Sequence, residues 1–248
     1  MLSKSQISFV NALHQKKHRK EQNLFIVEGS KSIIEFAQSD YTISTIYYTP
    51  ESFPKLGKLS QNVKLQEVSY SELTKISTLN NPQDALALIQ IPELTIFKKE
   101  SFKGKLVLVL DGVQDPGNLG TIIRTADWFG FTDIICSTDT VEAYNPKVVQ
   151  ASMGSLARVS IQYQELETIL PELGMPVYGT LLEGTSIYDT KFEEEGFIIL
   201  GNEGNGISPK IQSLITKSVT IPRFGNAESL NVAITAGIIC SEIKRNTK

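Results

Sequence analysis

Three blocks of polar residues and glycine hold the side chains that could do chemistry in this chain of 248 residues. In the first block, residues 110–124, a Pro116-Gly117 turn precedes Asn118, which is placed to cap the next helix. Arg124 follows on that predicted helix, where a guanidinium could clamp a phosphate through two parallel hydrogen bonds. A helix cap and a surface ion pair would explain the same two residues, so this block alone assigns no function.

The second block, residues 198–209, is a glycine-rich loop that contains Glu203. Its spacing, G-x-x-G-x-G, is neither that of a Walker phosphate loop nor the G-x-G-x-x-G dinucleotide fingerprint. Glycine lets the backbone approach a ligand closely, whereas the carboxylate of Glu203 would repel an anion. The block therefore favours a neutral or cationic ligand, with a plain turn as the alternative.

In the third block, residues 220–233, Pro222 ends a strand and a polar loop leads into a long helix. Ser229 is the expected N-cap of this helix, which puts Asn231 in the first turn beside free backbone amides. The helix is apolar on nearly every face, which indicates burial. A stripe of small residues, at positions 233, 236, 237 and 240, would let it pack closely on the sheet or on a second subunit.

Alternating apolar patterns predict the elements that position these blocks. Strands are expected at residues 106–110, 133–137, 177–181, 197–200 and 219–221, and helices at residues 119–129, 146–156, 166–173, 209–216 and 230–244. Such alternation predicts a mainly parallel sheet covered by helices, in which ligands bind beyond the carboxyl ends of the strands. Each block directly follows a predicted strand, so the three blocks are predicted to form one composite site.

The N-terminal part is predicted to alternate helices and strands, with a capping box at Ser69 and Glu72. A short, polar, Lys-rich segment, residues 92–104, reads as a linker. The first 20 residues contain no acidic side chain, and their densest basic run could contact RNA phosphates; it comprises Lys16, Lys17, Arg19 and Lys20. A solvated helix end would explain the run equally well.

Composition narrows the class of protein. A net charge of −3 and a pI of about 5.6 exclude a strongly basic protein, so any RNA site must be a local patch. Cys136 and Cys240 lie in apolar runs and are expected in the core rather than in a disulfide. No apolar stretch reaches the roughly 18 residues that span a membrane, and the N-terminus has no apolar signal core. We expect a cytoplasmic protein.

Together, the three blocks resemble the three motifs of the SpoU/TrmH branch of the SPOUT methyltransferases, over residues 105–245. The N-terminal part resembles the substrate-binding domain of that family, through residues 25–29 (FIVEG) and 81–83 (NPQ). The resemblance implies an α/β fold in which residues 105–248 form a parallel-sheet SPOUT domain with a deep trefoil knot. Residues 1–91 would form a small α/β, L30e-like RNA substrate-binding domain, joined through the linker at residues 92–104.

The activity implied by the resemblance is transfer of a methyl group from S-adenosylmethionine to a ribose 2′-hydroxyl of RNA. The expected substrate is 23S ribosomal RNA, and the expected assembly is a homodimer that needs no metal. The residues that match catalytic positions of the family are Asn118, Arg124, Glu203, Ser229 and Asn231. Those that match cofactor-contacting positions are Thr180, Leu181, Gly201, Ile221 and Leu230.

Chemistry limits the roles of these residues. A protonated guanidinium has no acceptor for a proton, so Arg124 is interpreted as a phosphate clamp and a stabiliser of developing alkoxide charge. Asn118 and Asn231 are expected to orient the substrate and Arg124, and Glu203 to hold either Arg124 or the loop. Three alternatives remain at this point: a transfer RNA substrate, a catalytically idle RNA-binding protein on the same scaffold, and an α/β enzyme that uses another nucleotide.

Overall fold

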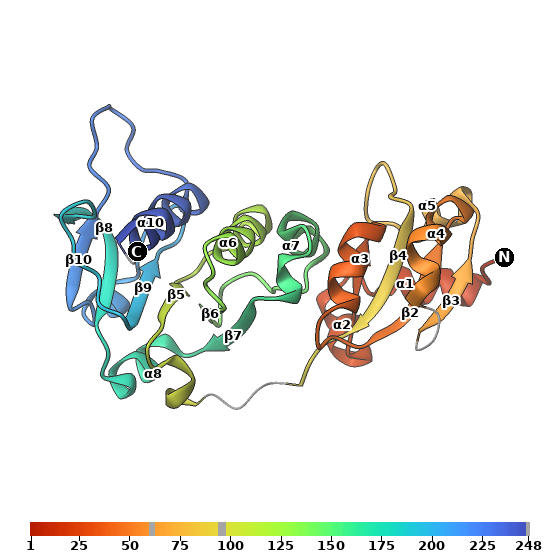
Figure 1. The fold of residues 1–248 in the computed structure, drawn as a ribbon, viewed down its shortest axis with the longest axis horizontal. Helices are drawn as coiled ribbons and strands as arrows, with labels where there is room; N and C mark the ends of the chain where they lie inside the picture. Colours follow the sequence, from red (N-terminus) through yellow and green to blue (C-terminus); the bar gives the residue numbers. More distant parts are fainter. Residues whose placement is uncertain (60–62, 94–97, 247–248) are drawn as a thin grey trace. The chain divides into compact units, whose positions relative to one another are not determined.

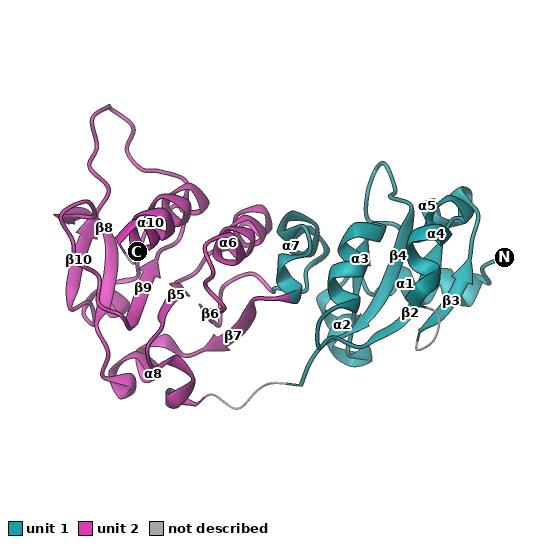
Figure 2. Cartoon of the chain, in the orientation of Figure 1, with its two compact units in different colours: residues 1–93, 143–157 teal, residues 94–142, 158–248 magenta. Residues whose placement is uncertain are grey.

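The structure is a computed structural model that describes residues 1–59, 63–93 and 98–246. The chain divides into two compact units (Figure 2): unit 1 comprises Met1–Glu93 with Ala143–Ala157, and unit 2 comprises Leu94–Glu142 with Arg158–Lys248. The chain therefore passes from one unit to the other three times. None of the described helices is long and apolar enough to cross a membrane.

Unit 1 contains a mixed four-stranded sheet in the order β1-β4-β2-β3 (Figure 1). Its strands are β1 (Leu24–Glu28), β2 (Ile43–Tyr48), β3 (Lys64–Glu67) and β4 (Ala85–Gln90). Strand β4 is antiparallel to both β1 and β2, and β3 runs parallel to β2. The helices are α1 (Lys4–Ala12), α2 (Lys16–Gln22), α3 (Ser30–Ala37), α4 (Phe53–Leu56) and α5 (Tyr70–Ile76), with short 3-10 turns η1 (Pro50–Ser52) and η2 (Gly57–Leu59).

Capping side chains determine where two helices of unit 1 begin. The predicted capping box of α5 is confirmed, because Ser69 and Glu72 each bond the backbone amide of the other. The carboxylate of Glu72 also accepts from the amide of Leu2, and these backbone bonds lower its pKa to about 2. Ser3 and Gln6 form a second capping box at α1. The first residues of the chain are thus tied to α5 by an ionised side chain.

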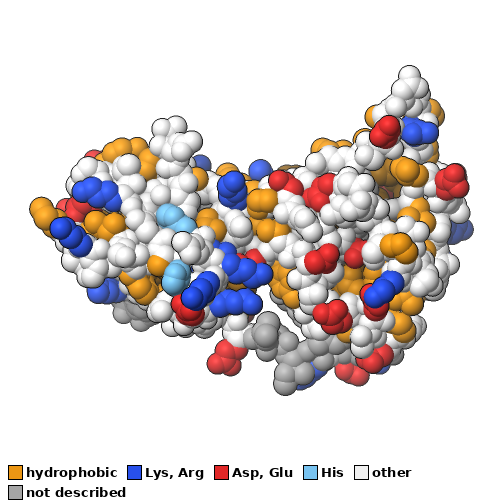
Figure 3. Space-filling model, turned by 180° about the vertical axis from the view of Figure 1, so that it is seen from behind, with side chains coloured by type: hydrophobic (Ala, Val, Ile, Leu, Met, Phe, Trp, Pro, Cys, Tyr) orange, Lys and Arg blue, Asp and Glu red, His pale blue; other side chains and the backbone are white. Residues whose placement is uncertain are grey.

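Helix α2 contains the basic run, and its structure changes the role predicted for one residue of that run. Lys16, Lys17 and Lys20 are exposed, whereas Arg19 is only 2% exposed. The Nη1 atom of Arg19 donates to the carbonyl oxygens of Leu13 and His14, at 2.9 Å each, beyond the end of α1. Arg19 therefore closes the turn between two helices rather than facing RNA. In Figure 3, Lys and Arg side chains gather beside the two histidines, His14 and His18.

A segment from much later in the chain completes unit 1. It contains α7 (Pro146–Ser152) and the 3-10 turn η4 (Ser155–Ala157), which contact β1 and α3. The ring of Tyr144 lies on that of Phe25, with centroids 4.7 Å apart, and its hydroxyl meets that of Tyr41 at 3.3 Å. Gly154, with φ of +90°, lies so close to α3 that a Cβ would be 2.9 Å from the Cγ of Glu35. Residues 143–157 thus pack as part of the N-terminal unit.

Asp84 stabilises the start of α3 and makes unit 1 sensitive to acid. Its carboxylate accepts from the amide and the hydroxyl of Ser30, at 2.9 and 2.7 Å, and from Lys55 at 3.4 Å. Partial burial opposes ionisation, but these hydrogen bonds outweigh it and the pKa of Asp84 is lowered. A lowered folded-state pKa contributes stability above the unfolded pKa of about 3.9, and that stability is lost as the pH falls through the folded pKa.

We therefore expect Asp84→Ala to lower the free energy of unfolding at pH 7 by about 1–2 kcal/mol, the usual effect of losing a charged cap. The difference from the wild type should shrink below about pH 4, where the wild-type carboxylate is lost too. Urea unfolding at both pH values measures this. Asp40→Ala is the matched control, because Asp40 is exposed and makes no hydrogen bond within the described residues. An equal loss at pH 7 and pH 3 would contradict the role of the charge.

Unit 2 is built on a six-stranded sheet, all parallel, in the order β10-β8-β9-β5-β6-β7. Its strands are β5 (Leu106–Leu110), β6 (Asp133–Ser137), β7 (Ser160–Gln164), β8 (Val177–Ser186), β9 (Gly196–Leu200) and β10 (Lys217–Thr220). Its helices are α6 (Pro116–Trp128), α8 (Leu166–Leu173), α9 (Pro209–Gln212) and α10 (Val232–Asn246), and η3 (Lys99–Phe102) is a 3-10 turn. The five predicted strands are confirmed, and β7 is an additional edge strand.

Both faces of the unit 2 sheet are covered, which explains its continuous apolar strands. On one face, Val107, Val109 and Ile199 join a core cluster with side chains of α8, α9 and η3. Helices α6 and α10 contact each other, and α10 also contacts β9 (Figure 1). The loops that follow the carboxyl ends of β5, β9 and β10 are those of the three polar blocks. The fold thus brings these blocks to one edge of the sheet.

Candidate active site

Helix α6 begins earlier than the sequence pattern suggested, and Asn118 does not cap it. Asp115 is the N-cap: its Oδ1 accepts from the amide of Asn118 at 2.8 Å, and Pro116 takes the first helical position. Asn118 therefore lies inside the first turn of α6, half-buried. Because Asp115 performs the capping, the amide side chain of Asn118 remains available for other partners.

The side chain of Asn118 joins the three blocks. Its Nδ2 donates to Oε1 of Glu203 in the second block at 3.0 Å. Its Oδ1 accepts from Nδ2 of Asn231 in the third block at 2.9 Å. The three residues are separated by 85 and 113 positions in the sequence, so only the fold can bring them together. The fold therefore brings these three side chains of the three blocks into contact.

Asn231, rather than Ser229, is the N-cap of α10. Its Oδ1 accepts from the amides of Ala233 and Ile234, at 2.9 and 3.3 Å. The Nδ2 of Asn231 is therefore left as a donor, and its acceptor must be the Oδ1 of Asn118. The Nδ2 of Asn118 is then the atom that donates to Glu203. The orientation of both amides is thus determined by the hydrogen bonds, starting from the first turn of α10.

Glu203 holds the loop of the first block rather than Arg124. Its carboxylate accepts from the amides of Gln114 and Asp115, at 3.4 and 3.3 Å, as well as from Asn118. Partial burial opposes ionisation, but the hydrogen bonds from Asn118 and the backbone outweigh it, so the pKa of Glu203 is lowered. An ionised carboxylate with this set of donors is a poor proton acceptor near neutral pH. Its evident role is to tie the second block to the first.

Asn202, which was not predicted as a site residue from the sequence, holds the conformation of the glycine loop. Its Oδ1 accepts from the amides of Gly204 and Asn205, at 2.9 and 3.0 Å, and its Nδ2 donates to the carbonyl of Gly112 at 2.7 Å. Gly201 permits this tight loop, because a Cβ there would lie 2.3 Å from the carbonyl carbon of Gly206. A polar amide directly after a buried strand was the signal that could have identified Asn202.

Two further buried polar residues fix the first block. Asp111, at the end of β5, accepts from the amide of Ser208 at 2.7 Å, next to the start of α9. The hydroxyl of Ser137, at the end of β6, accepts from the amide of Gly112 at 2.8 Å. Polar side chains buried at strand ends need such partners. Asp111 thus ties the loop between β5 and α6 to the start of α9, and Ser137 ties it to β6.

Arg124 and Ser229 are not part of the hydrogen-bonded junction. Both are exposed, and within the described residues neither makes a side-chain hydrogen bond or ion pair. Arg124 lies on α6 six residues after Asn118, more than one helical turn along the axis. An exposed guanidinium without a protein partner keeps all five of its donors for a ligand.

Four of the predicted cofactor positions lie where β9 and β10 end: Gly201 and Ile221 directly follow these strands, and Thr180 and Leu181 lie within β8, beside the end of β9. Gly179 pairs with Ile199, and the hydroxyl of Thr180 donates to the carbonyl of Ile199 at 2.8 Å. This register brings Thr180 and Leu181 to the level of Leu200 and Gly201. Thr220 donates to the carbonyl of Leu182 at 3.1 Å, which brings the end of β10 to the same edge.

Ile221 directly follows β10, and Leu230 is half-exposed just before α10. The groups at this edge are therefore backbone amides and carbonyls and apolar side chains, with the ionised Glu203 on the neighbouring loop. This set suits a ligand with an apolar face and a neutral or positive charge. The described residues contain no cluster of His, Cys, Asp or Glu that could hold a metal ion.

Two surface hollows of about 620 and 490 Å³ lie elsewhere in unit 2. The first is lined by residues of β8, β10 and the segment after β8, including Asp189 and Lys191. The second lies between α8 and the starts of β8 and β10, including Met175. Neither contains a residue of the predicted site, so the candidate site rests on the junction at Asn118.

Comparison with known proteins agrees with this geometry. Residues 105–241 match the SpoU rRNA Methylase family, and residues 4–87 match the MRM3-like substrate binding domain. The chain is 33% identical to the 23S rRNA (guanosine(2553)-2′-O)-methyltransferase RlmP of Bacillus subtilis over 238 residues, which covers 94% of this chain and 93% of that protein.

Solved structures agree over almost the whole chain. A structure from Porphyromonas gingivalis, assigned to the TrmH family of RNA methyltransferases, superposes with a TM-score of 0.86 at 39% identity and covers 99% of both chains. The AdoMet-bound rRNA methyltransferase from Sinorhizobium meliloti gives a TM-score of 0.87 at 28% identity, covering 100% of this chain and 98% of that one. The chain therefore belongs to the SpoU rRNA methylase family, S-adenosylmethionine-dependent enzymes that methylate RNA on the ribose 2′-hydroxyl.

Proposed function

We propose that this enzyme methylates a ribose 2′-hydroxyl of 23S ribosomal RNA. The observation that carries the proposal is the junction at Asn118, which unites the loops of all three motifs in one ionised, hydrogen-bonded arrangement. The choice of 23S ribosomal RNA is supported by the names of two relatives: the Bacillus subtilis protein, and a 23S rRNA (guanosine-2′-O-)-methyltransferase from Neisseria meningitidis that is 35% identical over 145 residues.

Residues at the carboxyl edge of the sheet fit S-adenosylmethionine. We assign Thr180, Leu181, Gly201, Ile221 and Leu230 to its binding, because backbone groups and apolar side chains suit an adenine ring. When bound, S-adenosylmethionine supplies an electrophilic methyl group on a cationic sulfonium. The carboxylate of Glu203, kept ionised by its donors, favours a cation in this region over an anion.

The proposed catalytic roles follow from the exposure of Arg124 and Ser229 and from the hydrogen bonds of Asn118 and Asn231. Arg124 binds an RNA phosphate and stabilises the charge that develops on the ribose oxygen. Asn118 and Asn231 hold the motif loops in register, because their amide orientations are fixed from α10. Ser229, exposed on the loop before α10, faces the substrate. Much of the rate acceleration then comes from alignment of the reacting atoms rather than from acid–base chemistry.

The proposed assembly is a homodimer with a deep trefoil knot in residues 105–248. Residues 1–91, together with residues 143–157 that pack with them, act as the substrate-binding part, and residues 92–104 act as the linker. The dimer is supported by α10, which buries Ala233, Ala236 and Cys240 but leaves Ile234 54% exposed. An exposed isoleucine in the apolar first half of α10 suits contact with a second subunit. Sedimentation of the intact protein measures the assembly directly.

Two measurements test the proposal. Calorimetric titration should detect S-adenosylmethionine binding, and its absence at millimolar cofactor would sink the proposal. Mapping of 2′-O-methyl groups in RNA from cells that lack the protein should then show one unmethylated position in 23S ribosomal RNA. Loss of a methyl group from transfer RNA instead would identify transfer RNA as the substrate. Cofactor binding with no lost methyl group in either RNA would contradict methylation of both classes of RNA.

The basic surface of α2 is the proposed RNA contact of unit 1. Changing Lys16, Lys17 and Lys20 to glutamate, with the buried Arg19 left intact, should weaken RNA binding and flatten its salt dependence, because each lost phosphate contact releases one counterion fewer. Filter binding of ribosomal RNA across salt concentrations measures both. Lys64→Glu is the control, since Lys64 is exposed on β3. Unchanged affinity would show that RNA docks elsewhere.

A further inference from the structure

The solvent face of α6 carries an unusual pair of side chains. Thr121, Arg124 and Trp128 are its exposed residues, at helical spacings of three and four, and the intervening Ile122, Ile123 and Ala126 are buried. Trp128 is 85% exposed, and Arg124 lies one turn before it. Residues four apart on a helix are neighbours, with Cβ atoms about 5–6 Å apart. A guanidinium and an indole, neither of which has a side-chain partner within the described residues, therefore lie side by side.

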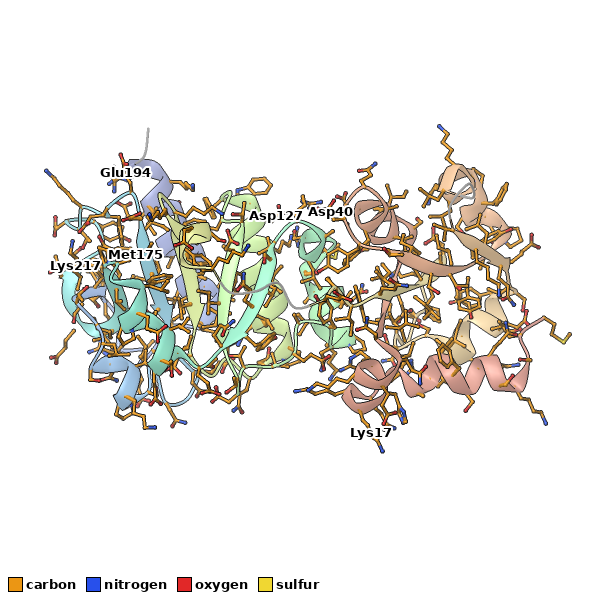
Figure 4. The ribbon with its side chains drawn as sticks, turned by 90° about the horizontal axis from the view of Figure 1, so that it is seen from below. Lys17, Asp40, Asp127, Met175, Glu194 and Lys217 are labelled. Carbon is orange, nitrogen blue, oxygen red and sulfur yellow. The ribbon has the colours of Figure 1, made fainter. Side chains whose placement is uncertain are left out.

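The charge around the indole is suited to a polyanion. Asp127, labelled in Figure 4, could repel phosphates, but Arg158 donates to both of its oxygens, from Nε to Oδ1 at 3.0 Å and from Nη2 to Oδ2 at 2.7 Å. That ion pair neutralises the carboxylate next to Trp128. Lys244 adds a cation near the end of α6, where its ammonium lies 5.0 Å from the ring centre of Phe131. Near this end of α6, Asp127 is thus paired, while Arg124 and Lys244 each supply a positive charge.

A large aromatic face exposed to water beside cations is the arrangement that binds single-stranded nucleic acid. Bases stack on aromatic side chains while basic groups follow the backbone, and any base can stack because each has a π-face. A second copy of this chain could also cover the indole. A protein partner would gain nothing from the unpaired guanidinium of Arg124 without an acidic group opposite it, whereas RNA supplies a phosphate and a base together.

We propose that the indole of Trp128 stacks on an unpaired base of the RNA substrate, while Arg124, one helical turn earlier, binds a phosphate of the same strand. The inference rests on the proposed function and adds to it a substrate class: RNA whose target region is single-stranded or has a base turned out of its helix. A fully paired helix would present no such base to α6.

The chain offers a direct probe, because Trp128 is its only tryptophan. The full-length protein is titrated with an end-labelled single-stranded oligoadenylate of about ten nucleotides. Binding is followed by the label and, separately, by tryptophan emission. Stacking should quench the emission in step with binding. An oligomer of equal length and charge that lacks bases should bind more weakly and leave the emission unchanged.

Variants separate the contribution of base stacking from the contribution of phosphate binding. Trp128→Ala should weaken oligoadenylate binding by about tenfold at every salt concentration, with an unchanged salt slope, since stacking releases no counterion. Trp128→Phe should restore most of the affinity. Arg124→Gln should reduce the salt slope by about 0.7, the value for one contact to a single strand. Tyr188→Ala, an exposed aromatic of the same unit, is the matched control and should bind as the wild type does.

Three results would overturn the inference. Binding without quenching, or no binding at low salt, would mean that no base reaches Trp128. Emission that depends on protein concentration without RNA, together with dissociation of an oligomer by Trp128→Ala, would place the indole between two copies of the chain. Methyl transfer to ribosomal RNA is measured separately, so its absence would refute the proposed function without deciding where the oligoadenylate binds.

Discussion

Replacement of Arg124 with alanine is expected to lower the turnover of methyl transfer by about 100- to 1000-fold, the effect of removing one donor from a developing oxyanion. S-adenosylmethionine should bind as it does to the wild type, because Arg124 is exposed and bonds to none of the proposed cofactor residues within the described chain. Single-turnover transfer of labelled methyl to ribosomal RNA, beside calorimetric cofactor binding, separates the two effects.

Two further variants sharpen this result. Arg124→Lys should recover little of the activity, since an ammonium cannot make the bidentate contact of a guanidinium. Lys210→Ala is the control: Lys210 is an exposed cation of the same unit, paired with Glu167 at 3.0 Å and remote in sequence from α6. Unchanged turnover in Arg124→Ala, or an equal loss in Lys210→Ala, would remove Arg124 from the site.

A fragment that ends at residue 93 is expected not to fold cooperatively at 25 °C. It would lack α7 and η4, and the ring of Phe25 would lose its contact with the tilted ring of Tyr144. Val148 and Leu156 of the missing segment are 0% and 1% exposed, and each buried side chain of this size is worth about 1.5–3 kcal/mol. A domain has only about 5–15 kcal/mol of net stability, so the loss is a large share of the total.

The test compares two fragments by urea unfolding and by binding of a dye to exposed apolar surface. Residues 1–93 alone should bind the dye and show no sharp transition. The same fragment with residues 143–157 attached by a flexible linker should unfold cooperatively. In the full-length protein, Tyr144→Ala should be destabilising, whereas Tyr188→Ala, exposed on unit 2, should not be. A sharp transition in residues 1–93 alone would show that the segment is dispensable.

Periodicity was sufficient for most of unit 2. Strands β5 and β6 were predicted at their observed bounds because both faces of the sheet are buried, which makes each strand a continuous apolar run. Strand β7 was missed because it lies at the edge, where Ser160, Gln162 and Gln164 alternate with Ile161 and Tyr163 and the side chains are half-buried or exposed. Its extended conformation is stabilised by pairing with β6, which its sequence pattern does not indicate.

The candidate site was predicted in outline, and its details depended on tertiary structure. Asn118 and Ser229 were each assigned as helix caps from local preference, but Asp115 and Asn231 perform the capping, since α6 begins earlier and α10 later than the apolar pattern suggests. The bond from Asn118 to Glu203 spans 85 residues, a separation at which local pattern carries no information. Arg19 was read as a surface cation because buried arginines are rare.

The placement of residues 143–157 also fixes an order of events during synthesis. A ribosome makes the chain from its N-terminus, and N-terminal domains usually fold as soon as they emerge. Unit 1 is completed only by α7 and η4, which follow β5 and β6 of unit 2 in the chain. The side of the Phe25 ring that contacts Tyr144 must therefore remain uncovered on the nascent chain until Tyr144 has left the ribosome. The N-terminal unit of this enzyme is begun first but finished only after synthesis of the catalytic sheet is under way.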